Sequence, residues 1–170
     1  GNRWGLVSTT VVAVGNGNTT NDSAASQHAP KNALGHSANY YAVQQQMIVF
    51  GGAMLEQDDA LAFSTKRGDE LWALDLPTMT WQLLSTAEEY EGPSPVHRTD
   101  HVAAIYGDNL YVYGGVNYES TELHGDLWRF NLQDRTWEKL YDHLQLEEDA
   151  REGGPEARFA AAACVLGGRL

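Results

Sequence analysis

The sequence lacks most features that mark disulfide-rich, membrane-spanning or nucleic-acid-binding proteins. It holds one cysteine, Cys164, so no internal disulfide can form, which favours an intracellular, cytoplasmic compartment. Its longest apolar run, residues 159–166, is too short to cross a bilayer, so we expect no membrane insertion. With 11 Lys and Arg against 23 Asp and Glu, the net charge of −12 argues against nucleic acid as a partner. Glycosylation sequons at Asn18 and Asn21 leave an extracellular location open.

The sequence does contain internal repeats. The stretches "DELWALDL" (69–76) and "TMTWQLLS" (78–85) recur as "GDLWRFNL" (125–132) and "DRTWEKLY" (134–141). Trp72 and Trp81 therefore correspond to Trp128 and Trp137, with the same spacing inside each pair. Repetition at a period of about 50 residues indicates a fold built from copies of one small unit.

The regions upstream of these blocks also repeat. "QMIVFGG" (46–52) and "NLYVYGG" (109–115) are apolar runs that end in the glycine pairs Gly51-Gly52 and Gly114-Gly115. Residues 30–36, 95–101 and 155–161 each begin with proline, and the first two end in histidine. The second unit has four short stretches rich in Val, Ile, Tyr and Trp, at 101–106, 110–115, 126–132 and 136–141, which predict a four-stranded antiparallel sheet.

These motifs resemble the kelch repeat, and "DLWRFNLQDRTW" is similar to the branch with an Asp-Leu-Trp third strand. The resemblance implies an all-β fold, a fragment of a kelch-type β-propeller with four-stranded antiparallel blades in an incomplete ring. The alignment predicts a last strand and linker at 1–29, complete repeats at 30–86 and 87–142, and a linker with the first strand of a truncated repeat at 143–170.

The repeated glycine and tryptophan residues are expected to be structural. Each glycine pair lets the backbone turn and a neighbouring strand approach closely. The four tryptophans are expected to pack between adjacent sheets, and stacking on a ligand is the alternative role.

Three residues are candidates for contacting a partner. Arginines in similar segments of BTB–kelch ubiquitin-ligase adaptors grip acidic peptides, so the resemblance suggests Arg98 and Arg158 as ligand-face residues. The alternative is that these arginines bind nearby carbonyls or acidic loops. Tyr118 lies in a variable insert, 116–126, where repeat proteins often place their specificity.

No residue pattern predicts catalysis. His97, Asp100 and His101 could suggest a metal site, but residues four apart on a strand are separated by about 13 Å, so we expect neither metal nor cofactor. The sequence therefore predicts a non-catalytic module that binds another protein or peptide, for example to recruit substrates to a ubiquitin ligase. The alternatives are the scaffold of a kelch-type sugar-processing or metal-dependent enzyme, and an extracellular kelch domain of a receptor.

Overall fold

All regular secondary structure in the described part of the chain is β-strand. The computed structural model describes residues 29–31, 34–56, 59–64, 68–86, 90–142 and 155–165, with the backbone alone at 55–56 and 59–64. The predicted all-β class is confirmed for these residues. They include no helix with the length and apolar character needed to span a membrane.

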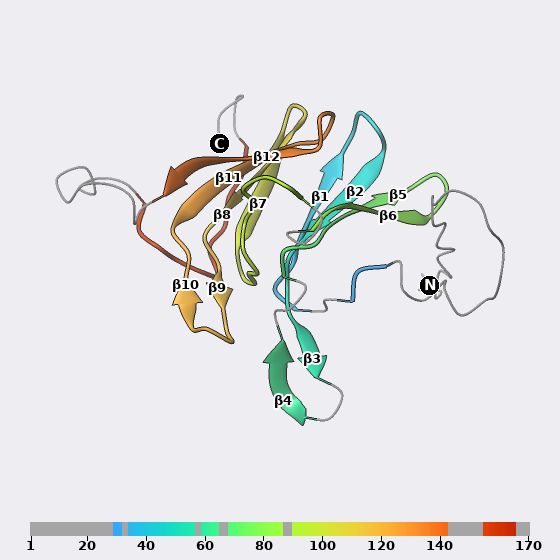
Figure 1. Cartoon of the computed structure of the whole chain (residues 1–170). Helices are drawn as coiled ribbons and strands as arrows, with labels where there is room; N and C mark the ends of the chain where they lie inside the picture. Colours follow the sequence, from blue (N-terminus) through green and yellow to red (C-terminus); the bar gives the residue numbers. More distant parts are fainter. Residues whose placement is uncertain are drawn as a thin grey trace, which may run out of the picture.

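Two four-stranded antiparallel sheets form the body of the molecule (Figure 1). The first sheet has the order β1 (Ser37–Tyr41), β2 (Gln46–Phe50), β5 (Leu71–Asp75), β6 (Thr80–Ser85). The second sheet consists of β7 (Val102–Tyr106), β8 (Asn109–Tyr113), β11 (Asp126–Asn131) and β12 (Thr136–Asp142) in the same topological order. This repetition confirms the four-stranded antiparallel units predicted from the sequence.

The last turn of each sheet is closed by an equivalent polar side chain. Asp75 Oδ1 accepts hydrogen bonds from the backbone N–H and the hydroxyl of Thr78. Asn131 Oδ1 accepts the backbone N–H groups of Gln133 and Asp134, each at 2.9 Å. Asp and Asn favour such turns because their short side chains bond to the backbone a few residues ahead. The two turns therefore explain why β5–β6 and β11–β12 form hairpins of the same kind.

Each insert between the second and third strands of a sheet forms a short hairpin, where the sequence indicated only a variable loop. β3 (Met54–Glu56) pairs with β4 (Asp59–Ser64), and β9 (Val116–Asn117) pairs with β10 (Glu122–Leu123). Both hairpins project from the same end of the two sheets (Figure 1). We call this the hairpin end.

The main hydrophobic core lies between the two sheets. Trp137 is central to it, with ring centroids 5.3 Å from Phe50 and 4.9 Å from Phe130. Its indole N–H donates to Ser85 Oγ of the first sheet at 3.1 Å. The buried cluster draws on both sheets: Tyr41, Ile48, Phe50, Leu71 and Ala73 from the first, Leu110, Val112, Trp128, Phe130 and Trp137 from the second, and Leu132 from the turn after β11. The two sheets therefore share one core.

The tryptophans differ in burial. Trp72, Trp128 and Trp137 are buried, whereas Trp81 is partly exposed. The indole N–H groups of Trp72 and Trp128 each donate to an acid two residues earlier, Glu70 and Asp126 respectively. An acid before the tryptophan of the third strand is therefore common to both sheets.

Residues 155–165 form no strand, although the sequence predicted the first strand of a further repeat in this region. A strand is defined by hydrogen bonds to a neighbouring strand, and the described residues contain no such neighbour for this segment. Its contacts instead run to the second sheet, as described below.

Candidate protein-interaction face

Three equivalent segments lead into the repeats, and they are joined to one another in a row. We call them the lead-in segments: residues 30–36 (of which 32 and 33 are not described), 95–101 and 155–161. Each holds one residue in the left-handed region, at Gly35 (φ 63°), Asp100 (φ 53°) and Ala160 (φ 52°). The Asp100 N–H donates to the Gly35 carbonyl at 2.8 Å, and the Ala160 N–H donates to the Asp100 carbonyl at 2.9 Å. The three segments therefore share a left-handed residue at the same position, and this residue links each segment to the next.

The glycine pairs hold the second and third lead-in segments against the sheet that precedes each of them. Gly52 N–H donates to the Arg98 carbonyl at 2.9 Å, and Gly115 N–H donates to the Arg158 carbonyl at 2.8 Å. A Cβ on Gly51 would lie 2.8 Å from the Arg98 carbonyl oxygen, which is closer than real Cβ contacts allow. Glycine is therefore required here for close approach as well as for its positive φ of 65°.

Arg98 is fully buried, at 0% exposure, which corrects its assignment to the ligand face. Its Nη1 and Nη2 donate to the two carboxylate oxygens of Asp126 at 2.6 and 3.0 Å. It also donates to the carbonyls of Gly114 and Val96, at 3.0 and 3.1 Å. Each of these acceptors lies close to the guanidinium, so Arg98 binds nearby carbonyls and an acid inside the fold.

The carboxylate of Asp126 completes a buried polar cluster. Burial alone would raise the pKa of Asp126, but the hydrogen bonds and charge of Arg98 outweigh it and lower the pKa. The indole N–H of Trp128 donates to Asp126 Oδ2 at 2.6 Å and favours the charged form further. The cluster ties the second lead-in segment to β11.

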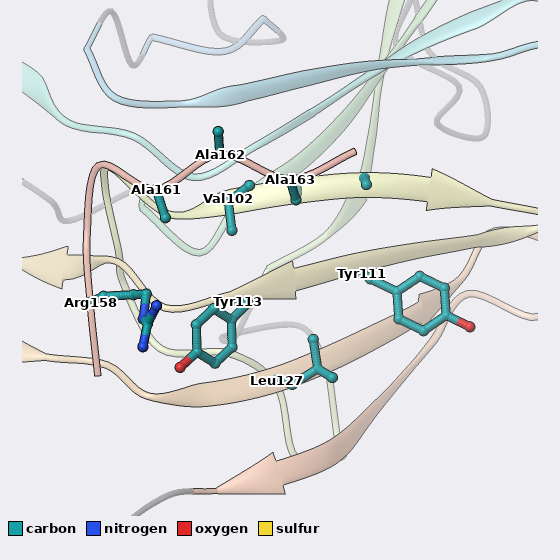
Figure 2. Close-up of a pocket in the computed structure, with 10 residues that line it drawn as sticks. Val102, Tyr111, Tyr113, Leu127, Arg158, Ala161, Ala162 and Ala163 are labelled. Atoms are coloured by element: carbon teal, nitrogen blue, oxygen red, sulfur yellow. The ribbon is translucent and has the colours of Figure 1, made fainter. Parts of the chain in front are cut away.

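Arg158 occupies the equivalent position in the third lead-in segment, but its side chain is exposed. Its Nε donates to the Glu156 carbonyl at 3.0 Å, as Arg98 Nε donates to the Val96 carbonyl. Its side chain borders a hollow of about 260 Å³ beside Tyr113, Leu127 and Ala161 (Figure 2). The structure therefore separates the two predicted arginines into one buried and one exposed residue.

Tyr118 is the exposed aromatic residue of the β9–β10 hairpin, with 47% of its surface accessible. Its hydroxyl donates to Asp100 Oδ2 at 2.8 Å, and this hydrogen bond is the main cause that raises the pKa of Tyr118. Asn117 Oδ1 accepts the N–H groups of Glu119 and Ser120, which fixes the turn that carries Tyr118. Tyr118 is thus held in place over the second lead-in segment.

Asp100, at the hairpin end, holds Tyr118 in place, a role that the sequence did not indicate. Its backbone lies in the row of lead-in segments, and its side chain is held by Tyr118. A Cβ on Gly35 would lie 2.7 Å from Asp100 Oδ1, so the carboxylate rests against a position that has no side chain. The sequence signal that could have identified Asp100 is its equivalence to Gly35 of the first repeat. A glycine there indicates a left-handed backbone, and Asp tolerates positive φ better than most residues.

The histidines near Asp100 have separate partners. His101 is buried, and its Nε2 lies 2.8 Å from Ser37 Oγ. His97 Nδ1 lies 3.4 Å from Asp69 Oδ1. Among the described residues, no three His, Cys, Asp or Glu side chains are grouped in a way that could hold a metal ion.

Repeated four-stranded sheets, glycine pairs and lead-in segments define a repeat protein of the β-propeller class. The chain belongs to the kelch-repeat family, since the family model described as the KLHDC2/KLHL20/DRC7 Kelch-repeats domain matches residues 7–170. This match confirms the resemblance drawn from the glycine and tryptophan motifs.

The relatives of the chain are much longer proteins. It is 32% identical over 137 residues to human host cell factor 2, a match that covers 74% of this chain and 15% of that protein. It is 32% identical over 142 residues to rat multiple epidermal growth factor-like domains protein 8, covering 83% and 5%. It is 31% identical over 120 residues to the host cell factor homolog hcf-1 of Caenorhabditis elegans, covering 66% and 14%. Kelch repeats and host cell factor relatives indicate a protein-interaction module.

Proposed function

We propose that this chain is a non-catalytic part of a kelch propeller and that it binds a partner protein through its hairpin end. The observation that carries the proposal is the Tyr118–Asp100 pair. An exposed aromatic ring is fixed to a carboxylate by a 2.8 Å hydrogen bond, on a hairpin whose turn is itself fixed by Asn117. A pre-positioned tyrosine loses little conformational freedom when it is buried by a partner, which makes it a suitable contact residue.

The architecture also supports the hairpin end as the binding surface. Both inserted hairpins project from it, and they differ in length between the repeats, whereas the strands of the two sheets match closely (Figure 1). Variation in loops carried by a constant scaffold is the usual way in which repeat proteins acquire specificity. The predicted contact residue Tyr118 belongs to one of these hairpins.

The test compares two exposed tyrosines at opposite ends of the second sheet. Tyr118 is at the hairpin end, and Tyr106, 45% exposed, ends β7 at the opposite turn. A photo-crosslinking residue at each position in the intact protein would identify bound partners, and calorimetry with the purified partner would then measure affinity. We expect Tyr118→Ala to weaken binding at least about tenfold, or 1.4 kcal/mol, and Tyr106→Ala to leave it unchanged. Equal effects, or turnover of a small molecule without any partner, would contradict the proposal.

A finer hypothesis is that the bound partner is a substrate for ubiquitination. The resemblance to BTB–kelch adaptors suggests it. If it is correct, the partner's half-life in cells should lengthen when the intact protein carries Tyr118→Ala and stay the same with Tyr106→Ala. An unchanged half-life, together with weaker binding, would reject the ubiquitin-ligase role and leave the binding role intact.

A further inference from the structure

Asp100 is the one left-handed residue in the row of lead-in segments that carries a charge. The equivalent positions hold Gly35 and Ala160, which adopt the same left-handed backbone without a functional side chain. The links between the segments run through backbone N–H and carbonyl groups, so they do not need the carboxylate of Asp100. This carboxylate is therefore a feature of the second repeat alone, and a contact specific to this protein is a reason for its presence.

The Tyr118–Asp100 pair joins an exposed aromatic ring to a carboxylate that can accept further hydrogen bonds. The Tyr118 hydroxyl donates to Asp100 Oδ2 at 2.8 Å, and 47% of the tyrosine surface is accessible. A carboxylate has about four lone-pair positions, and Tyr118 fills one of them. Among the described residues, no Lys, Arg or His side chain forms an ion pair with Asp100.

The β9–β10 hairpin beside this pair is negatively charged. The sequence contains no Lys or Arg between Arg98 and Arg129, and the charge of Arg98 is buried against Asp126. Glu122 of this hairpin has a side chain that is 56% exposed, 4.0 Å from Nδ1 of His124. Burial is the main cause that lowers the pKa of His124, so this imidazole is neutral at neutral pH and does not offset the Glu122 charge.

Arg158 is exposed, but its side chain lies on a different surface. Its Nε donates to the Glu156 carbonyl at 3.0 Å, and it borders the hollow beside Tyr113 on the outer face of the second sheet (Figure 2). The position that pairs with the Asp100 carboxylate is thus left to a cation from outside the described residues.

We propose, building on the proposed function, that the Tyr118–Asp100 pair recognises an arginine side chain of the partner protein. The guanidinium stacks on the Tyr118 ring, and its N–H groups donate to the Asp100 carboxylate. A guanidinium is planar and forms both contacts at once, whereas the compact ammonium group of lysine has no flat face to stack. The negative charge of Glu122 attracts the positively charged segment towards the pair.

The proposed ligand has the opposite charge to the acidic peptides suggested by the resemblance to BTB–kelch adaptors. In those adaptors, arginines form the ligand face. Here Arg98 is enclosed and paired with Asp126, and Asp100, two residues later in the same lead-in segment, lies under the exposed Tyr118. The same segment therefore presents an acid in place of a base.

A peptide selection on the intact protein tests the charge of the ligand before the partner is known. Randomised short peptides are selected on the wild type, on Asp100→Asn and on Asp134→Asn. Asparagine tolerates the left-handed backbone and keeps an oxygen that accepts from Tyr118, so the first variant removes the charge and preserves the geometry. Asp134, an exposed acid in the β11–β12 turn, is the matched control.

We expect the wild type and Asp134→Asn to enrich peptides that contain arginine, and Asp100→Asn to lose this preference. Enrichment of acidic peptides, or no enrichment of arginine, would overturn the proposal. Equal enrichment of lysine and arginine would overturn the assignment of a guanidinium.

A selected arginine peptide then measures the contact by calorimetry. Exchanging its arginine for citrulline, which has the same shape without the charge, should weaken binding to the wild type at least about tenfold. Asp100→Asn should cause a similar loss, and Asp134→Asn should cause none. Added salt should weaken binding to the wild type more than binding to Asp100→Asn. Citrulline binding as tightly as arginine would refute the contact without relying on any protein variant.

The partner captured by crosslinking at position 118 separates this inference from the proposed function. If Tyr118→Ala weakens its binding and Asp100→Asn does not, the hairpin end binds a partner without using an arginine, and only the inference fails. If Tyr118→Ala has no effect, the proposed function fails and the inference fails with it.

Discussion

The guanidinium of Arg98 holds both carboxylate oxygens of Asp126, at 2.6 and 3.0 Å, without exposing any of its own surface. The two residues lie 28 positions apart, in a lead-in segment and in β11. A buried pair of this kind connects the start of a repeat to its third strand.

Breaking this pair from one side should be strongly destabilising. Arg98→Met leaves the Asp126 carboxylate without its cation, and we expect the free energy of unfolding to fall by about 3 kcal/mol. Chemical denaturation of the variant and the wild type measures the difference. The double variant Arg98→Met with Asp126→Leu should lose less than the two single variants added together, because no charge then stays unpaired. Simple additivity would show that the pair is not coupled.

His101 should make stability depend on pH. Burial is the main cause that lowers the pKa of His101 to about 3, and the charges of Arg98 and His36 lower it further. The unfolded chain takes up a proton on this histidine near pH 6.5, whereas the folded state takes it up only at much lower pH. The unfolded state is therefore favoured, and stability is lost, as the pH falls below about 6.5. Between pH 7.5 and 5.5 the loss should be about 1.4 kcal/mol.

His101→Asn provides the control for this effect. The variant should lose about 1.4 kcal/mol less than the wild type over the same two pH units, since carboxylates and other histidines titrate in both proteins. Parallel pH profiles for the two proteins would show that His101 is not the group responsible.

Gly51, in a glycine pair, and Gly107, in the β7–β8 turn, allow a test that separates close approach from backbone conformation. Gly51 and Gly107 both have positive φ, 65° and 60°. A Cβ on Gly51 would lie 2.8 Å from the Arg98 carbonyl oxygen, whereas nothing lies within 4 Å of a Cβ on Gly107. Gly107→Ala should cost only the left-handed conformation, about 1 kcal/mol. Gly51→Ala should cost at least about twice as much in an unfolding titration, and similar losses would rule out the close-approach explanation.

Trp137 and Trp81 hold the same place in the two repeats but differ in burial. Trp137 packs between the sheets, whereas Trp81 is partly exposed. Trp137→Ala should lower the free energy of unfolding by about 3–5 kcal/mol, because it removes a buried aromatic ring and its hydrogen bond to Ser85. Trp81→Ala, measured in the same way, should cost clearly less. A larger loss of unfolding free energy for Trp81→Ala than for Trp137→Ala would contradict the placement of the main core around Trp137.

The repeats explain how far the sequence could predict the fold. Strands carry a local signal, and the matched spacing of Trp72 with Trp81 and of Trp128 with Trp137 made that signal visible twice. The short β9–β10 hairpin could not be read in this way, because the two-residue strands that form it have too few side chains to show alternation.

The candidate site was less predictable than the fold. Tyr118 could be named because it is an aromatic residue in a variable insert, but its hydrogen bond to Asp100 depends on how the hairpin folds back over the lead-in segment. The resemblance to BTB–kelch adaptors suggests Arg98 for the ligand face, and the sequence does not show which acid this arginine meets. Only the tertiary structure reveals that Asp126 lies within 2.6 Å of it.

The row of lead-in segments has a polarity. In both of its links, from Asp100 to Gly35 and from Ala160 to Asp100, the later residue donates and the earlier one accepts. A straight row of such bonds always has one unused donor at one end and one unused acceptor at the other, however many members it has. Curving the row until its ends meet removes both. The direction of two backbone hydrogen bonds thus provides a reason for a series of these repeats to close into a circle.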